Sequence, residues 1–492
     1  MGLIVNQMLH FRGISANIDR NMNAYMKIVW LVMLSAMAGC VTYQDRPLLP
    51  ANTLEDFESR RLDTDELETY LDKNLEGGSS GSWGLPQLTL AAFFFNPQLD
   101  IARSRLSGAK GQEKAAAEYP NPDLGVTPGF NSTSGYSAPV SPWILDVALD
   151  IPIETAGKRG YRIAEARYLS ESARLQIAQT AWELRRQVRE ALLNLYSATR
   201  KEALLDSREL LEKDKVKLLG QLLDLGEISA NELSLARVTH EETRLAWLDE
   251  NKHKVQARMQ LAAAIGVPGK ALEAIEFSFD AFEALPDEAP PADAQRRAML
   301  NREDLLSAMA DYQACQSALQ REVARQFPDV HLGPGYEFDQ SENKWSLGLS
   351  VNLPIFNQNR GAIAAAEARR EEAAAKFIAI QAQIVGDIEQ AVASYRACLR
   401  KVEAAELLSK ELQATVDRLR KMYEVGEVVM LNVTAAELEL NTNAVNRLGA
   451  RIEALRAMGQ LEDAMHAAAD LPNWSQRVPE NRTEHVGNQD HE

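Results

Sequence analysis

The chain has 492 residues, of which 53 are lysine or arginine and 70 are aspartate or glutamate, so its formal net charge is −17. An acidic surface repels phosphate, which argues against a nucleic-acid backbone as the main partner. A hydrophobic content of 46% and a charged content of 25% are ordinary for a folded protein, and they argue against wholesale disorder and against a multi-span helical membrane protein.

The N-terminus has the features of a bacterial lipoprotein signal. Residues 26–40 read MKIVWLVMLSAMAGC, in which Lys27 precedes an apolar run and small residues precede Cys40. Such a segment predicts a signal peptide, and its end resembles a lipobox, whose cysteine is lipidated after cleavage. We therefore expect residues 1–39 to be a signal peptide, Cys40 to be lipidated and residues 40–84 to form a lipidated N-terminal segment. The alternative is a buried apolar helix that ends in cysteine.

The rest of the chain contains one unit twice. Residues 143–167 (WILDVALDIPIETAGKRGYRIAEAR) and 345–369 (WSLGLSVNLPIFNQNRGAIAAAEAR) share a tryptophan, a Pro-Ile pair and an Ala-Glu-Ala-Arg end at one offset. Residues 222–236 and 422–436 share a Gly-Glu pair at nearly the same offset. Matches in the same order at nearly constant spacing indicate an internal duplication with a unit of about 200 residues.

Each copy carries a predicted strand hairpin, at 123–153 and 329–355. Apolar and polar or small residues alternate strictly along both strands of each hairpin, and the connections are polar. Strands of this length with one apolar face are typical of transmembrane barrels, although a soluble antiparallel sheet with one buried face alternates in the same way. Four strands cannot close a barrel, for which about eight is the smallest number, so a membrane barrel requires oligomerisation. Three copies would supply twelve strands.

Each hairpin is followed by a predicted helical hairpin, at 155–265 and 357–468. Apolar residues recur there at three- and four-residue spacing, and the first helix of each pair has about 70 residues, or roughly 100 Å. Gly226 and Gly426 suit helix C-termini, and Ser229 is placed as the N-cap of a return helix. Shorter helices are predicted near 88–118 and 301–326.

These elements predict a domain order. In sequence, we expect a first repeat at 85–283, a linker at 284–300, a second repeat at 301–468 and a polar tail at 469–492.

Motifs for catalysis or metal binding are missing from the sequence. It contains no glycine-rich phosphate loop, no GxSxG and no HExxH, and its seven histidines do not fall at metal-ligand spacings. We therefore expect no enzyme, no catalytic residues, no metal site and no cofactor.

Four stretches carry a resemblance to a known family. LTLAAFFFNPQLDIA, DIPIETAGKR, NREDLLSA and NLPIFNQNRG, in this order, resemble the TolC-type outer-membrane efflux proteins over roughly residues 85–468. The resemblance implies an α+β fold and a homotrimer, in which a twelve-stranded transmembrane β-barrel with four strands per chain continues into a long periplasmic α-helical barrel. It implies the exit duct of a tripartite pump, with a periplasmic adaptor (membrane fusion) protein and an inner-membrane transporter as partners. The lipobox further resembles lipid-anchored members that serve RND-type exporters, which places the protein in the outer membrane and extending into the periplasm.

The resemblance also implies functional residues at the tips of the two helical hairpins. In the family these tips contact the adaptor and form the closed entrance. The matching positions here are Leu225, Gly226 and Glu227 in the first copy and Val425, Gly426 and Glu427 in the second. Family members often carry an acidic ring at the entrance, for which the candidates are Asp224, Glu227, Glu424 and Glu427. The alternative is that the glycines are only helix caps and the carboxylates only solvated.

Three functions are therefore considered. The first is an outer-membrane duct that passively exports small molecules, either drugs or metal ions. The second is the exit duct of a type I protein-secretion system, against which the lipobox counts mildly. The third is a periplasmic adaptor or scaffold lipoprotein without a pore, which would have no need of strands with a lipid-facing side.

Overall fold

A computed structural model of the chain describes residues 41–75, 81–132, 140–467 and 478. The predicted signal peptide, Cys40 and nearly all of the predicted polar tail lie outside the described residues. The chain divides into two units, Met1–Phe57 and Glu58–Glu492. Most of α2 (Pro50–Ser59) belongs to the first unit, and the other described helices and strands belong to the second. Within the described part of the chain, no helix is long and apolar enough to cross a membrane.

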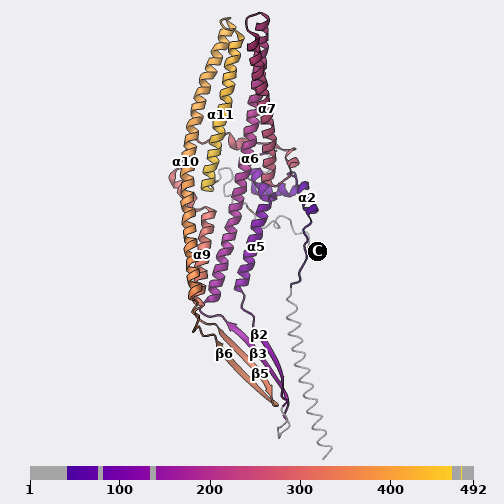
Figure 1. The fold of residues 1–492 in the computed structure, drawn as a ribbon, viewed down its shortest axis with the longest axis vertical. Coiled ribbons are helices and arrows are strands. Elements are labelled where there is room, and N and C mark those ends of the chain that lie inside the picture. The colour runs from indigo at the N-terminus through magenta and orange to yellow at the C-terminus, as the bar shows by residue number, and fades with distance from the viewer. Residues whose placement is uncertain (1–40, 76–80, 133–139, 468–477, 479–492) are drawn as a thin grey trace, which may run out of the picture. The chain divides into compact units, whose positions relative to one another are not determined.

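The strands of the two copies form one antiparallel sheet (Figure 1). Its order is β2-β3-β5-β6, so that β3 and β5 join the copies and β2 and β6 are the edges. The bounds are Asp123–Phe130 for β2, Trp143–Ile153 for β3, Val330–Asp339 for β5 and Glu342–Val351 for β6.

The second strand hairpin differs from the prediction in the length of its connecting turn and in the position at which its second strand ends. Its connection is only Gln340 and Ser341, both with positive φ (48° and 69°), which suits a two-residue hairpin turn. At the other end β6 stops at Val351 instead of continuing to 355. Val351 pairs with Val330, the first residue of β5, so the residues after it have no partner on this side of the sheet.

In each copy, two shorter helices precede the strands of the sheet and two long helices follow them. They are α4 (Leu85–Phe95), α5 (Pro97–Ala117), α6 (Lys158–Asp224) and α7 (Ala230–Ile265) in the first copy, and α8 (Ala292–Leu300), α9 (Glu303–Ala324), α10 (Arg360–Glu424) and α11 (Met430–Met465) in the second. The 67 residues of α6 extend for roughly 100 Å at 1.5 Å per residue. Both α5 and α7 pack along α6, and both α9 and α11 pack along α10, while α6 also contacts α9 and α11 and so joins the copies.

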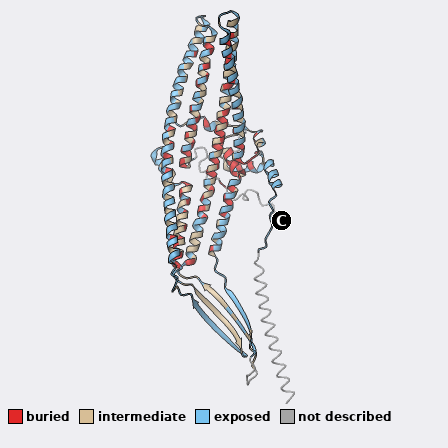
Figure 2. Cartoon of the chain, in the orientation of Figure 1, coloured by how far each residue is buried: buried red, intermediate tan, exposed pale blue. Residues whose placement is uncertain are grey.

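The largest hydrophobic core lies midway along α6, where α4 packs against α6 and α7 and α3 (Asp65–Asn74) packs on α4 (Figure 2). We call this region the waist. Leu67, Tyr70 and Leu71 of α3 are buried there, so the segment that we predicted as an N-terminal extension supplies part of the core. The predicted linker likewise contains the helix α8, and the predicted helix 88–118 is two helices. The break is at Asn96, whose side chain caps α5 by accepting a hydrogen bond from the backbone N–H of Gln98 (3.0 Å).

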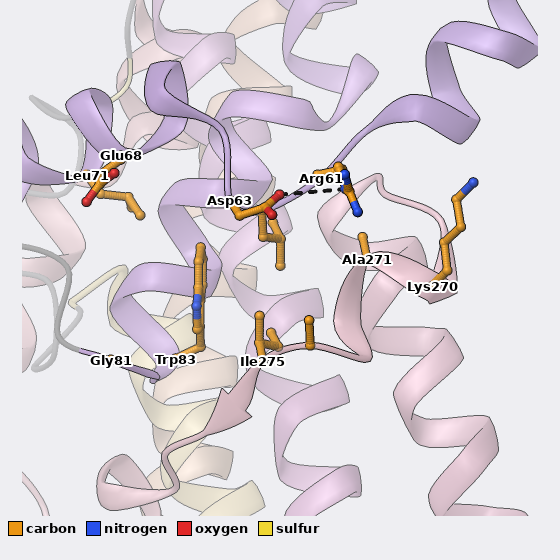
Figure 3. Close-up of a pocket in the computed structure, with 11 residues that line it drawn as sticks. Arg61, Asp63, Glu68, Leu71, Gly81, Trp83, Lys270, Ala271 and Ile275 are labelled. Atoms are coloured by element: carbon orange, nitrogen blue, oxygen red, sulfur yellow. Dashed lines mark ion pairs between the residues drawn. The ribbon is translucent and has the colours of Figure 1, made fainter.

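A short parallel pair of strands closes the waist. Ser82–Trp83 (β1) pairs with Glu276–Phe277 (β4), which brings the chain after α3 against the chain after α7. Beside this pair lies a half-open cavity of about 450 Å³ (Figure 3). Trp83 and Ile275 line it, and the exposed ion pair Arg61–Asp63 (3.8 Å) lies at its rim.

Candidate functional site

The four-stranded sheet exposes a continuous apolar face. In the register of the sheet, apolar residues lie opposite one another on all four strands, for example Val126 against Val147 and Tyr336 against Trp345. We call this the apolar face, and its most exposed members are Leu124, Val126, Phe130, Trp143, Trp345, Leu347 and Leu349. Trp345 is 81% exposed and Leu347 72%, which is unusual for such large side chains in a folded chain. The face requires an apolar environment outside the chain.

The opposite face of the same sheet is polar or small. Asp146 lies opposite Thr127 and Glu337, and Gly333 lies opposite Gly348. Ion pairs on this face join His331 Nδ1 to Asp150 Oδ2 at 3.0 Å and Lys344 Nζ to Asp339 Oδ2 at 2.9 Å. Apolar residues outward and polar residues inward along every strand is the arrangement of a transmembrane barrel wall.

Aromatic side chains mark both ends of the apolar face. At the hairpin end, Phe130 packs edge-on against Trp143 (ring centroids 5.0 Å apart) and Tyr336 packs against Trp345 (4.9 Å). At the helical end, exposed Phe327 and Phe356 lie in the connections next to the strands. The 11 residues of β3 rise about 36 Å, which a barrel tilt of about 40° reduces to roughly 27 Å, close to the apolar band of an outer-membrane barrel.

The first turn of α6 ties the sheet to the helices. Lys158 Nζ donates to Phe327 O (2.5 Å) and to Asp329 Oδ1 (2.8 Å), and so holds the connection between α9 and β5. Arg162 donates through Nε to Ala116 O (2.9 Å) and so holds the C-terminal end of α5. A cation is favoured at the Arg162 position because the last carbonyls of a helix carry partial negative charge.

The second copy makes the corresponding connection without a cation. Asn359, just before α10, donates through Nδ2 to the backbone oxygen of Glu322 (2.8 Å). These roles were not predicted, although the Gly-Lys-Arg and Asn-Arg-Gly stretches that carry them belong to the segments that resemble the family.

The two hairpin tips have the same backbone. Gly226 and Gly426 adopt left-handed φ values of 73° and 80°. After each glycine a glutamate N–H bonds back to the helix, Glu227 to Leu222 O and Glu427 to Met422 O, both at 2.9 Å. These are the bonds of a Schellman C-cap, which explains why glycine stands at both positions.

The structure brings the two tips to the same end of the molecule (Figure 1). Leu431, directly after the second tip, packs against the cluster formed by Leu219, Leu233 and Ala236 beside the first. Leu225 and Val425 are 76% and 72% exposed. The four carboxylates proposed for the acidic ring are also exposed, and within the described part of the chain the structure shows no ion pair for any of them; they are Asp224, Glu227, Glu424 and Glu427.

The tips differ in how the return helix begins. Ser229 Oγ accepts from the backbone N–H of Glu232 (3.3 Å) and caps α7, whereas Val429 stands at the N-cap of α11 and offers no side-chain acceptor. The sequence predicted the first cap.

An exposed apolar sheet face, a polar opposite face, and helical hairpins of about 100 Å define a class of outer-membrane efflux channels. A comparison with protein-family models agrees: the family model "Outer membrane efflux protein" matches residues 85–267 and 295–465. The chain belongs to this family, and the predicted resemblance and α+β fold are confirmed.

Two curated relatives are named for metal resistance or cation efflux. The chain is 24% identical over 374 residues to the cobalt-zinc-cadmium resistance protein CzcC of Cupriavidus metallidurans, a match that covers 75% of this chain and 85% of CzcC. It is 25% identical over 225 residues to the cation efflux system protein CusC of Escherichia coli, covering 43% of this chain and 49% of CusC.

Among solved structures, the chain is similar to the outer membrane protein VceC of Vibrio cholerae. The TM-score is 0.63 at 20% sequence identity, and the match covers 77% of this chain and 95% of VceC. This likeness concerns the fold.

Proposed function

We propose that this protein is the exit duct of a tripartite pump that exports transition-metal cations across the periplasm and the outer membrane. Three copies close a twelve-stranded barrel whose wall is the apolar face, and their helical hairpins form a tunnel. The observation that carries the proposal is the continuous apolar face on a sheet that leads directly into helices of about 100 Å. An adaptor without a pore would not need such a face.

The metal substrate is supported by the relatives CzcC and CusC, whose names record cobalt-zinc-cadmium resistance and cation efflux. The net charge of −17 adds a weak electrostatic preference for cations in the tunnel. The duct is passive: an inner-membrane RND-type transporter supplies the energy, and a periplasmic adaptor joins the two at the tips. No catalytic step is required of this chain.

A deletion strain tests the function. We expect it to become sensitive to salts of cobalt, zinc or cadmium, to keep its resistance to dyes, detergents and antibiotics, and to recover with the gene on a plasmid. Broad sensitivity to amphiphilic drugs would contradict the metal substrate and assign a multidrug duct. Unchanged resistance together with a changed secreted proteome would assign protein secretion.

Cys40 anchors the protein by its lipid in this proposal. We expect Cys40→Ser to abolish the incorporation of radioactive palmitate, because the acylated thiol is removed. The barrel would still hold the protein in the membrane, since acyl chains contribute far less than a spanning structure. Palmitate labelling that persists in Cys40→Ser would refute the assignment, and Cys315→Ser is the matched control that should label normally.

A further inference from the structure

In each copy, the helix that returns from the tip ends against the start of a shorter helix: α7 meets α5 in the first copy, and α11 meets α9 in the second. In the first copy, α7 ends at Gly266 against the start of α5, and we call this contact the first joint. Asn96 Nδ2 donates to Ala264 O (2.9 Å), and Arg60 Nη1 donates to Gly266 O (2.7 Å). Gly266 has a φ of 88°, and a Cβ there would lie 3.0 Å from Asn96 Cα, so the position requires glycine.

In the second copy, α11 ends at His466 against the start of α9, and we call this contact the second joint. His466 also adopts a left-handed φ, 49°, which is costly for a residue with a side chain. Its Nδ1 lies 2.9 Å from Glu303 Oε2, and its ring stacks on Trp182 of α6 with centroids 5.0 Å apart. Where the first copy has a neutral glycine, the second therefore has a strained, half-buried and titratable residue.

Charged groups of α6, of the start of α9 and of α11 itself lie around this histidine. From α6, Arg185 and Arg189 reach Glu462 (3.0 and 3.7 Å), and Arg186 is close enough to influence Asp463. From α9, Arg302 Nη1 donates to Ala464 O (2.5 Å), and its other nitrogens bond both oxygens of Asp304. From α10, the cluster beside Met465 receives apolar side chains, among them Ile384 and Ile388.

The pKa values of two carboxyl groups in this cluster are shifted in opposite directions. Burial opposes the ionisation of Asp304, but the hydrogen bonds from Arg302 outweigh it and hold the pKa of Asp304 below its usual range. Burial raises the pKa of Asp463 to about 6, although Arg185 and Arg189 act in the other direction. Asp463 Oδ1 is buried without a hydrogen-bond partner among the described residues.

We propose that the second joint is a pH-sensitive lock, which holds α11 on α9 in acid and loosens as the pH rises, while the first joint does not respond. The lock itself stands on the geometry above, and only its use rests on the proposed function. Because α11 carries the second tip at its other end, a looser joint gives the second helical hairpin more freedom to move at the duct entrance.

The direction follows from linkage. The closed joint binds the Asp463 proton more tightly than an open, hydrated joint does, so rising pH favours opening until it passes the pKa of about 6 in the closed state. Between about pH 5 and pH 7.5 this carboxyl alone changes the opening equilibrium about tenfold. His466 links this carboxyl to the rest of the joint, because its Nδ1 contacts Glu303 at 2.9 Å and its ring stacks on Trp182.

Trp182 supplies the probe. The purified trimer is labelled with 5-fluorotryptophan, and its fluorine NMR spectrum is recorded between about pH 5 and pH 8, the range in which histidine switches. The Trp182→Phe variant assigns the resonance. We expect the Trp182 signal to shift with a midpoint near pH 6, while the signal of Trp83, which packs at the waist of the first copy, stays constant.

Two variants test the groups. Asp463→Asn removes the buried acid, and His466→Asn keeps a residue that tolerates left-handed φ and leaves Asp463 in place. We expect Asp463→Asn to abolish the pH-dependent shift and His466→Asn to retain one. A Trp182 signal that does not change with pH in the wild type, or a shift that survives in Asp463→Asn, would overturn the proposal. Because this experiment involves no transport, a failure to export metals leaves its outcome unaffected.

Discussion

We expect the Leu347→Arg chain to be lost from the outer membrane, whereas the Ser346→Arg chain assembles there as the wild type does. The two residues are neighbours on β6 and point to opposite faces of the sheet. Leu347 pairs with Pro334 on the apolar face, and Ser346 pairs with Gly335 on the polar face. An arginine near the midplane of the lipid face costs about 2–4 kcal/mol, and a trimer would carry that cost three times.

The measurement is the amount of SDS-resistant trimer in isolated outer membranes, compared between unheated and heated samples. Ser346→Arg adds the same charge at almost the same height, so it controls for charge, expression and strand pairing. Gly335, opposite Ser346, leaves room for the longer side chain. Normal trimer yield from Leu347→Arg would show that the apolar face is not in contact with lipid. Loss of both variants would place the defect in the sheet rather than in its membrane contact.

Much of this architecture could be predicted because its signals are local. Alternation with period two shows which side of a strand Leu347 occupies, and it does so without knowledge of any partner strand. The tips could be predicted because glycine at positions 226 and 426 is selected by backbone conformation alone. The duplication strengthened each signal by showing it twice.

The missed features depend on contacts between distant parts of the chain. A helix ends at Asn96, whose side chain bonds Ala264 O in the first joint. The apolar sequence around Asn96 does not indicate this break, but the Asn-Pro pair does. The buried face of α3 becomes visible only when α4 packs on it. His466 looked like one of several scattered histidines, and only alignment of the two copies places it where the first has Gly266.

The attachment of the segment between the two repeats also depends on a contact between distant parts of the chain. The side chain of Tyr395 is buried and its hydroxyl donates to Pro286 O, so the segment between the repeats is fixed to α10. Burial raises the pKa of Tyr395 to about 12, which keeps the hydroxyl a donor at any physiological pH. The prolines of this segment indicated a linker, but no local pattern indicated its attachment.

At the duct entrance we expect Gly426→Leu to leave the trimer in the outer membrane and to abolish most of the metal resistance. A Cβ at Gly426 meets no atom within 4 Å, so the leucine fits, and the left-handed φ of 80° costs about 1 kcal/mol per chain. That cost is small for a long helical hairpin. The new side chain projects from the exposed tip, where a close approach by the adaptor would be obstructed.

Resistance to the exported metal and the yield of SDS-resistant trimer are measured together. Gly426→Asn is the matched control, because asparagine tolerates left-handed φ and is smaller, so it should keep more resistance than leucine. Loss of the trimer in Gly426→Leu would make the glycine a structural cap only. Full resistance with a normal trimer would remove the second tip from the adaptor contact.

The two tips should not respond equally. Gly226 has nearly the same φ, 73°, and equally open space, so Gly226→Leu carries the same backbone strain. The first tip, however, is reinforced by the Ser229 cap, which is worth about 1 kcal/mol, and α11 begins at Val429 without one. The start of the return helix is therefore less stable at the second tip, and the same backbone strain should disorder it more. We expect Gly426→Leu to reduce resistance more than Gly226→Leu does. Installing Val429→Ser beside Gly426→Leu should recover the part of the loss that comes from fraying and leave the part that comes from obstruction.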